Sequence, residues 1–148
     1  HEHLPIQMSG GFYAWASGGL GFALPAAVGV ALADPSRKVI AVLGDGSSLY
    51  TIQGLWTAGQ QRLPITFVVL NNAGYGAVTS LGARRGIAHM PASDFPGVDF
   101  VALARGFGCR ASHVTQAAQL APALAEAYAA DEAWLLEVRM ASAADRLY

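Results

Sequence analysis

Apolar runs of strand length alternate along this chain with longer segments of helical composition, and Gly, Pro or Asp residues separate the two kinds. An apolar run without alternating polar positions is typical of a strand buried on both faces of a parallel sheet. Longer segments rich in Ala and Leu are typical of helices packed against such a sheet. Strands are therefore expected at 39–43, 65–70, 109–111 and 134–138, and helices at 22–33, 52–61, 100–105 and 115–130.

The order of these elements predicts an α/β protein with a doubly wound, mostly parallel sheet and helices on both faces. We expect a lead-in segment over 1–17, one domain over 18–140 and a tail over 141–148. Between 73 and 97 the chain is Gly-rich and irregular, which predicts a long loop with room for one short helix. Loops of this length in compact domains are usually functional or poorly ordered.

Several single residues sharpen the helix predictions. Asp99 is expected to cap the third helix and Thr115 the last, because short polar side chains accept hydrogen bonds from the free amides of a first turn. Pro122 lies inside the last helical pattern and predicts a late start or a kink there. In the second helix, Leu55 and Trp56 are expected on an apolar face.

The composition and net charge of the chain exclude some classes of function. The chain has 148 residues, of which 53% are hydrophobic and 13% charged, and its formal net charge is −1. This charge gives no general attraction to nucleic acid or anionic lipid, and no apolar run is long enough to span a membrane. Such low charge favours a surface partly covered by a partner chain or a missing domain, so we expect a homo-oligomer. The opening HEHLPIQ lacks a signal-peptide pattern, which favours a cytoplasmic protein and a fragment or processed product.

Cysteine, arginine, histidine and tryptophan often have functional roles in proteins, but in this chain buried structural or solvated positions are favoured for them. Cys109 is the single cysteine, which excludes an internal disulfide and a thiolate-rich zinc site, and a buried apolar role is favoured over a nucleophile. Arg84-Arg85 and His89 are expected to be solvated, although His89 could line a substrate channel. The other histidines (His1, His3, His113) lie in no metal or triad pattern, and the tryptophans (Trp15, Trp56, Trp134) suit a core or an interface.

The candidate chemistry lies where two successive strands are expected to end. Asp45 stands in Gly44-Asp45-Gly46-Ser47 after one strand, and Asn72 in Asn71-Asn72 after the next. Ligands of open α/β sheets bind at the carboxyl ends of strands, so a βαβ unit can bring these side chains together. Their oxygens suit Mg²⁺ or Ca²⁺, and Mg²⁺ is usually shared with phosphate oxygens. The flanking Gly44 and Gly46 permit a tight turn and a close approach to a phosphate, and the amides of the following helix favour an anion.

The spacing of GDGS and NN resembles the signature of thiamine-diphosphate-dependent enzymes. The resemblance is specific to the benzoylformate decarboxylase group and covers most of 10–140. It rests on the stretches GGLGFALPAAVGVALADPSRKVIAVLGDGS, LWTAGQQRLPITFVVLNNAGYGAV and FPGVDFVALARGFG. It implies that Asp45, the side-chain oxygen of Asn72 and the main-chain carbonyl of Gly74 bind the metal ion. Ser47 and the amides around Gly46 would hold the diphosphate, and Tyr75 would lie close by.

The same resemblance assigns further residues. Leu20 matches the bulky apolar residue that supports the bent cofactor, and Gly18 matches the residue whose carbonyl accepts a hydrogen bond from the aminopyrimidine. Ala77 and Leu81, with Tyr75, match the region that faces the substrate pocket. Gly19-Leu20-Gly21 is also a fragment of a dinucleotide-binding fingerprint, but that motif's third Gly is missing.

The implied function is decarboxylation of a small 2-keto acid with thiamine diphosphate and Mg²⁺ as cofactors. The family's catalytic glutamate belongs to a separate pyrimidine-binding domain, and its catalytic histidines also lie outside this segment. We expect no catalytic residue here and an inactive isolated chain that needs a pyrimidine-binding domain or subunit. Alternatives are a domain of an acetolactate synthase or aldehyde lyase, or a non-catalytic interaction domain descended from such an enzyme.

Overall fold

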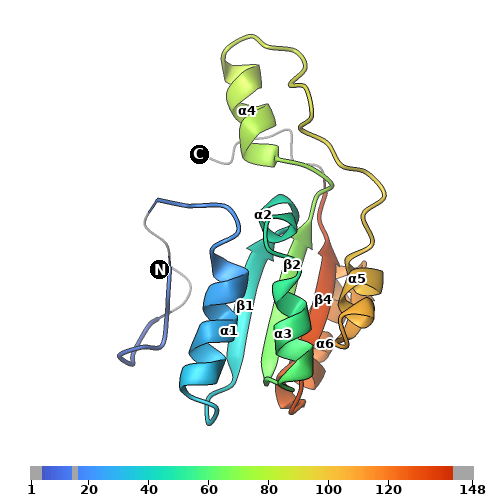
Figure 1. Cartoon of the computed structure of the whole chain (residues 1–148). Helices are drawn as coiled ribbons and strands as arrows, with labels where there is room; N and C mark the ends of the chain where they lie inside the picture. Colours follow the sequence, from blue (N-terminus) through green and yellow to red (C-terminus); the bar gives the residue numbers. More distant parts are fainter. Residues whose placement is uncertain (1–4, 15–16, 142–148) are drawn as a thin grey trace.

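A four-stranded parallel sheet forms the centre of the molecule in the computed structural model, which describes residues 5–14 and 17–141 (Figure 1). The strand order is β1-β2-β4-β3, so the chain leaves the sheet after β2 and returns beside it with its last strand. The strands are β1 (Val39–Gly44), β2 (Ile65–Asn71), β3 (Arg110–Val114) and β4 (Trp134–Arg139). The helices are α1 (Ala23–Ala33), α2 (Asp45–Leu49), α3 (Gly54–Gln60), α4 (Gly76–Arg84), α5 (Phe100–Gly106) and α6 (Ala117–Ala129).

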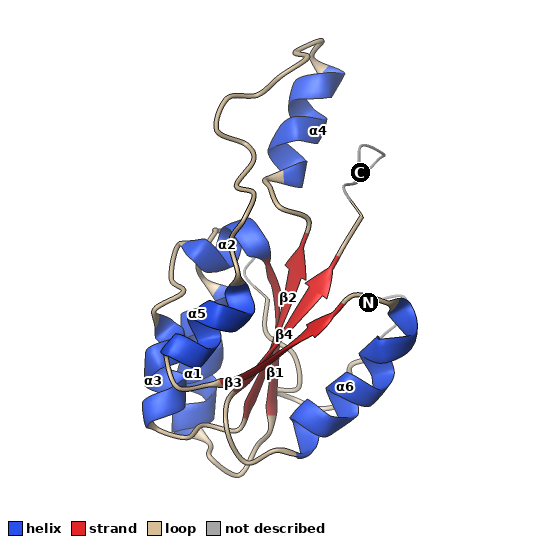
Figure 2. Cartoon of the chain, turned by 90° about the vertical axis from the view of Figure 1, so that its right-hand side faces the viewer, coloured by secondary structure: helices blue, strands red, loops and turns tan. Residues whose placement is uncertain are grey.

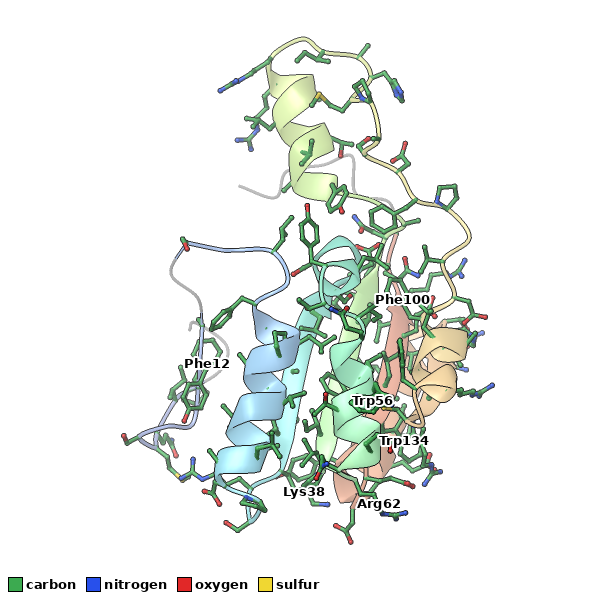
Figure 3. The ribbon with its side chains drawn as sticks, in the orientation of Figure 1. Phe12, Lys38, Trp56, Arg62, Phe100 and Trp134 are labelled. Carbon is green, nitrogen blue, oxygen red and sulfur yellow. The ribbon has the colours of Figure 1, made fainter. Side chains whose placement is uncertain are left out.

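Helices cover the two faces of the sheet unequally. Helices α1, α3 and α5 lie on one face and α6 lies on the other (Figure 2). The larger core fills the first face and includes Phe67, which is fully buried. It also includes the fully buried Phe100 (Figure 3). Smaller clusters around Val68 and Leu136 lie beneath α6. The α/β class, the parallel sheet and the helices on both faces are confirmed.

Strand β1 departs from the prediction of burial on both faces. Ile40 and Val42 are 50% and 61% exposed, while Ala41 and Leu43 of the same strand are buried. Helix α6 packs on β2, β3 and β4, so in the described part of the chain it leaves the matching face of β1 uncovered. The strand is also at the edge of the described sheet, whereas β2 lies between two strands and is buried almost throughout.

Strand register aligns the two segments expected to carry the chemistry. β1 and β2 are parallel, with Gly44 opposite Leu70. The residues that follow each of these, Asp45 and Asn71, therefore lie at the same level along the strands. The carboxyl ends of both strands open toward the same edge, below α4 (Figure 1).

The helix expected at 52–61 is present as α3, and a further short helix before it, α2, was not predicted. Helix α2 begins at Asp45 itself, and α3 begins only at Gly54. Leu55 is fully buried but Trp56 is 56% exposed, so the prediction of one apolar face containing both residues is wrong (Figure 3). Successive helical residues point about 100° apart, so the narrow buried face of a short helix takes only one of them.

The cap expected at Asp99 is confirmed, because its carboxylate accepts a hydrogen bond from the amide of Ala102 at 2.8 Å. The cap expected at Thr115 is wrong, since the N-cap of α6 is Gln116. The side-chain oxygen of Gln119 accepts from the amides of both Thr115 and Gln116, which satisfies the start of the helix without the Thr115 hydroxyl. The helix begins before Pro122 and not after it.

The long loop over 73–97 contains one helix, α4, which projects beyond the carboxyl ends of the strands (Figure 1). Gly82 is its one buried residue and faces Met90 of the returning loop. Val78 and Leu81 of α4 are 42% and 52% exposed. This helix therefore gains little stability from the rest of the described chain.

Cys109 is buried in the main core, as expected, and its thiol donates a hydrogen bond to the carbonyl of Leu55 at 3.2 Å. Burial raises the pKa of this thiol from 9.0 to about 11. Above pH 9 the unfolded chain loses the thiol proton while the folded chain keeps it, so folding stability falls as the pH rises. We expect a loss of about 2 kcal/mol between about pH 8 and about pH 10.5 from this group alone.

Denaturant unfolding at several pH values tests this expectation. Other groups titrate in the same range, so the quantity to compare is the difference in unfolding free energy between the natural chain and Cys109→Ala. That difference should shrink with rising pH by about 2 kcal/mol. Parallel pH dependences in the two proteins would show that burial leaves the thiol unperturbed.

Candidate metal and diphosphate site

Asp45 anchors the carboxyl end of β1 to the loop that follows β2. Gly44 is extended and Asp45 is the first residue of α2, a sharp change of direction that buries the carboxylate to 3% exposure. Its Oδ1 accepts a hydrogen bond from the amide of Gly46 at 2.7 Å. Its Oδ2 accepts from the amides of Asn72 and Gly74 at 3.0 and 3.2 Å. The structure thus brings Asp45 together with both other predicted metal ligands.

The loop after β2 is bent to make these contacts. Ala73 has a φ of +60°, a left-handed conformation that costs a non-glycine residue about 1 kcal/mol. The side-chain oxygen of Asn71 accepts a hydrogen bond from the Ala73 amide at 2.9 Å and stabilises the bend. This bend directs the amides of Asn72 and Gly74 toward Asp45. Backbone strain of this kind is often found at functional sites.

The Asn72 carboxamide completes a cluster of oxygens. Its inner end lies 3.0 and 3.1 Å from the two carboxylate oxygens of Asp45 and 2.9 Å from the main-chain oxygen of Gly74. With the nitrogen Nδ2 at this end, the amide donates to all three oxygens. With Oδ1 there, four oxygens meet without a proton between them, which only a cation makes favourable. Rotating one side-chain amide by half a turn therefore changes a hydrogen-bonded cluster into a set of metal ligands.

The donor set fits Mg²⁺. Mg²⁺ binds oxygen at 2.0–2.1 Å in octahedral geometry, so neighbouring ligand oxygens lie about 2.9 Å apart. The separations of 2.9 to 3.1 Å between the inner end of the Asn72 carboxamide and the surrounding oxygens match this spacing. Three protein residues would leave positions for oxygens of a phosphate and for water.

Tyr75 closes one side of this cluster by packing directly on Gly46. A Cβ atom at Gly46 would lie 2.7 Å from Cδ1 of Tyr75 and 3.2 Å from Cζ of Phe95. The two rings meet edge to face with centroids 5.1 Å apart. Burial, then the nearby Tyr50 phenol and the charge of Asp45, raise the pKa of Tyr75. Its hydroxyl therefore keeps its proton at neutral pH and can donate a hydrogen bond.

Ser47 ties the Gly-rich turn before α1 to the start of α2. Its hydroxyl oxygen accepts a hydrogen bond from the amide of Gly21 at 3.0 Å, which leaves the hydroxyl proton free to donate. The hydroxyl of Thr51 donates to the carbonyl of Gly21 at 2.8 Å. Gly21 has a φ of +81°, which its lack of a side chain permits. The segment containing Gly18 and Leu20 is thereby held beside the Asp45 turn.

The predicted cofactor and substrate-pocket residues outside the Asp45 cluster lie on open surfaces. Gly18 has a φ of +63° and open space around its Cα, and Leu20 is 51% exposed. Ala77 and Leu81 are exposed on α4, and no hydrogen bond of the described residues joins them to the Asp45 cluster. His89 is exposed in the loop after α4, and Trp134 lies in the core. His1, His3 and Trp15 lie outside the described residues.

Sequence reasoning missed a buried polar pair next to this site. The Asn71 side-chain nitrogen donates to Oε1 of Glu137 at 2.7 Å, and Glu137 is 3% exposed. The signal was a lone glutamate inside the apolar strand 134–138, since ionised residues are rarely buried without a partner. Asn71, the first residue of the Asn pair, thus contacts both Glu137 and the loop that carries Asn72.

Comparison with known proteins matches this chain to one family model and to several enzymes. The model of the family described as "Thiamine pyrophosphate enzyme, C-terminal TPP binding domain" matches residues 1–138. Benzoylformate decarboxylase of Pseudomonas aeruginosa is 44% identical over 137 residues, which are 93% of this chain and 26% of that protein. Acetolactate synthase isozyme 2 large subunit of Escherichia coli is 36% identical over 124 residues, 82% of this chain and 22% of that protein.

Solved structures of two decarboxylases also superpose on this chain. A thiamine diphosphate-dependent 4-hydroxybenzoylformate decarboxylase from Rhodococcus jostii superposes with a TM-score of 0.83 and 45% identity, covering 88% of this chain and 25% of that one. Benzoylformate decarboxylase from Polynucleobacter necessarius superposes with a TM-score of 0.89 and 34% identity, covering 96% and 28%. The chain spans about a quarter of the length of these relatives.

Proposed function

This chain belongs to the thiamine pyrophosphate enzymes, as their C-terminal TPP-binding domain, and we propose that it holds the diphosphate of that cofactor through Mg²⁺. The observation that carries the proposal is that one end of the Asn72 carboxamide lies 2.9 to 3.1 Å from the Asp45 and Gly74 oxygens, the separation of neighbouring ligands in an Mg²⁺ shell. The strained φ of Ala73 supports the proposal, because backbone strain is often found at functional sites.

Each residue of the site has a distinct task in this proposal. Asp45 supplies the anionic ligand, and the amides that it binds hold its carboxylate in one orientation. Asn72 and Gly74 supply neutral oxygens. The free hydroxyl proton of Ser47 and the phenol of Tyr75 are donors for diphosphate oxygens. Gly44 and Gly46 keep the turn without side chains, so that a phosphate can approach the backbone.

We propose that the whole protein is a 2-keto-acid decarboxylase of the benzoylformate decarboxylase type. The bound cofactor would supply the electron-accepting ring that makes loss of carbon dioxide possible. This chain orients the diphosphate, and Leu20 and the Gly18 carbonyl support the rest of the cofactor. Ala77 and Leu81 on α4 contribute to the substrate pocket. Catalytic proton transfer requires a pyrimidine-binding domain or subunit, so the isolated chain does not turn over substrate.

Exposed apolar side chains support an assembly of this kind. They lie on the open face of β1, on α4 and near the Gly-rich turn, and groups of exposed apolar side chains are typical of interfaces. The whole protein is proposed to be a homo-oligomer in which other domains cover these positions: Ile40, Val42, Val78, Leu81, Leu20 and Tyr50.

A chimaeric enzyme tests the function. In the benzoylformate decarboxylase of Pseudomonas aeruginosa, the matching segment is replaced by this chain, and release of carbon dioxide from benzoylformate is measured with and without Mg²⁺. Metal-dependent decarboxylation supports the proposal. Formation of acetolactate from pyruvate without decarboxylation of benzoylformate would favour the acetolactate synthase alternative. A folded chimaera that binds no cofactor would leave the non-catalytic alternative.

Leu20→Ala separates a cofactor-contacting role from a structural one. Leu20 is half exposed in this chain, so its truncation should change the unfolding free energy by less than about 0.5 kcal/mol. In the chimaera the same change should lower kcat/KM by about tenfold, because a misplaced cofactor loses catalytic geometry. Leu32→Ala is the matched control, since Leu32 on α1 is 50% exposed. Equal kinetic effects of the two changes would remove Leu20 from the cofactor site.

A further inference from the structure

A second group of potential ligands lies on the other side of the Asn pair. Asp99, His113 and Glu137 each present one ligand atom, and these atoms all lie within 4.8 Å of one another. The three residues line an open hollow of about 450 Å³ at the carboxyl ends of the strands. The cluster shares no residue with Asp45, Asn72 and Gly74.

The fold places these three side chains on one surface. His113 of β3 and Glu137 of β4 are paired in the strand register, so their side chains point to the same face of the sheet. Leu135, two residues before Glu137, packs in the core that includes Phe100 of α5, which identifies this face as the one beneath α5. Asp99 is the N-cap of α5 and therefore stands at the edge of the same surface.

Glu137 is the member that points to a ligand. Its carboxylate is almost fully buried, and Oε2 has no hydrogen-bond partner among the described residues. Nδ1 of His113 lies 3.4 Å from this oxygen. A buried carboxylate oxygen without a partner is costly, by about 1–3 kcal/mol or more. Such an atom in a native site requires an explanation, and a bound ion is one.

In each carboxylate, one oxygen is held in place by a hydrogen bond from the protein. Glu137 Oε1 accepts from Asn71 at 2.7 Å, and Asp99 Oδ1 accepts from the Ala102 amide at 2.8 Å. Hydrogen bonds of this kind hold metal ligands in the orientation that binding requires, and they contribute to metal affinity. Arg139 also lines the hollow, but the described residues show no ion pair between it and either carboxylate.

We propose that Asp99, His113 and Glu137 form a second metal site, which takes a divalent transition metal such as Zn²⁺. An imidazole nitrogen and two carboxylate oxygens suit Zn²⁺ better than Mg²⁺ or Ca²⁺, which prefer oxygen alone. Ligands of a tetrahedral Zn²⁺ lie about 3.4 Å apart. Rotation of the exposed Asp99 and His113 side chains toward the fixed Glu137 provides the small contraction needed.

The site would bear on the loop of the diphosphate site through Asn71. The two ends of the Asn71 carboxamide bind Glu137 and the Ala73 amide, and Ala73 bends the loop that carries Asn72. A metal ion on Glu137 Oε2 would hold Asn71 in this orientation. The second site would thus stabilise the conformation of this loop. Its three ligands do not depend on whether the loop binds a diphosphate or a metal ion.

Calorimetric titration of Zn²⁺ into the untagged full chain tests the proposal. Excess Mg²⁺ is present so that sites of oxygen ligands are already filled, and His1→Ala with His3→Ala removes the N-terminal histidines in every protein used. One Zn²⁺ per chain is expected to bind. His113→Ala and Glu137→Gln should each weaken binding by at least about tenfold. His89→Ala, which changes an exposed loop histidine, should leave the affinity unchanged.

Asp99→Asn and the absorption of bound Co²⁺ distinguish the loss of a metal ligand from the misfolding of a variant. Asparagine is also a good N-cap, so this variant keeps the start of α5 while it loses the anionic ligand. Bound Co²⁺ should show visible absorption bands that disappear in His113→Ala, whose altered side chain is half exposed and leaves the core intact. Zn²⁺ affinity unchanged by His113→Ala, or no bound Zn²⁺ in the parent chain, overturns the proposal. In that case His113 and Glu137 form only a proton-dependent ion pair.

Discussion

Asp45→Asn is expected to weaken Mg²⁺-dependent binding of thiamine diphosphate by at least about 100-fold. The change removes the one anionic side chain of the Asp45–Asn72–Gly74 cluster, and a hard cation such as Mg²⁺ depends strongly on carboxylate charge. Loss of residues that merely orient ligands already costs 10–100-fold in metal affinity. Asparagine keeps one oxygen for the amides of Asn72 and Gly74, so the fold should survive.

Calorimetry at fixed Mg²⁺ measures this loss, and two controls locate it. Asp131→Asn removes the same charge from an exposed carboxylate that pairs with Lys38 on the surface. It should leave cofactor affinity unchanged. Thermal unfolding shows whether Asp45→Asn remains folded. Equal affinities of a folded Asp45→Asn variant and the natural chain would remove Asp45 from the metal site.

Gly59→Ala should destabilise the chain by about 2–3 kcal/mol, the cost of overpacking a rigid contact. A Cβ atom at Gly59 of α3 would lie 2.5 Å from the Phe107 carbonyl oxygen and 3.1 Å from the carbonyl carbon of Gly108. Both are backbone atoms, so neither can rotate away. The gain in helix propensity, about 0.5–1 kcal/mol, is smaller than this cost. The melting temperature should fall by roughly 5–10 °C.

Gly29→Ala is the matched control for this prediction. Gly29 also lies within a helix, α1, but it is exposed, and beyond its own helix no described atom would lie within 4 Å of an added Cβ. The same substitution there should be neutral or stabilise by up to about 1 kcal/mol. If both variants lose stability equally, the close approach of α3 to Phe107 is not what requires glycine at 59.

Much of the fold follows from sequence because uninterrupted apolar runs mark the strands. All four expected strands are present, and Asp99 caps α5 as its position before Phe100 indicates. The exposed face of β1 could not be foreseen, because Ile40 and Val42 are as apolar as residues that a helix covers. Apolar composition predicts that a face is buried, but not whether this chain or another segment buries it.

One candidate site could be predicted from the sequence, and the other could not. The juxtaposition of Asp45 and Asn72 could be inferred because each follows a strand, and parallel strands align such positions. The cluster of Asp99, His113 and Glu137 could not, because its members come from a helix cap and two strands with no motif spacing. Only the register of β3 against β4 makes His113 and Glu137 neighbours. Helix α2 was not predicted, because GDGS is also typical of a plain turn.

The most direct test is a crystal structure of this chain grown with thiamine diphosphate and Mn²⁺, in which anomalous scattering locates the metal. We expect an ion within about 2.5 Å of a carboxylate oxygen of Asp45, Oδ1 of Asn72 and the main-chain oxygen of Gly74, with the diphosphate as a further ligand. We also expect Asn72 to turn its oxygen, and not its nitrogen, toward Asp45. A diphosphate bound without a metal at these three oxygens, or a metal bound only elsewhere, would contradict the proposed site.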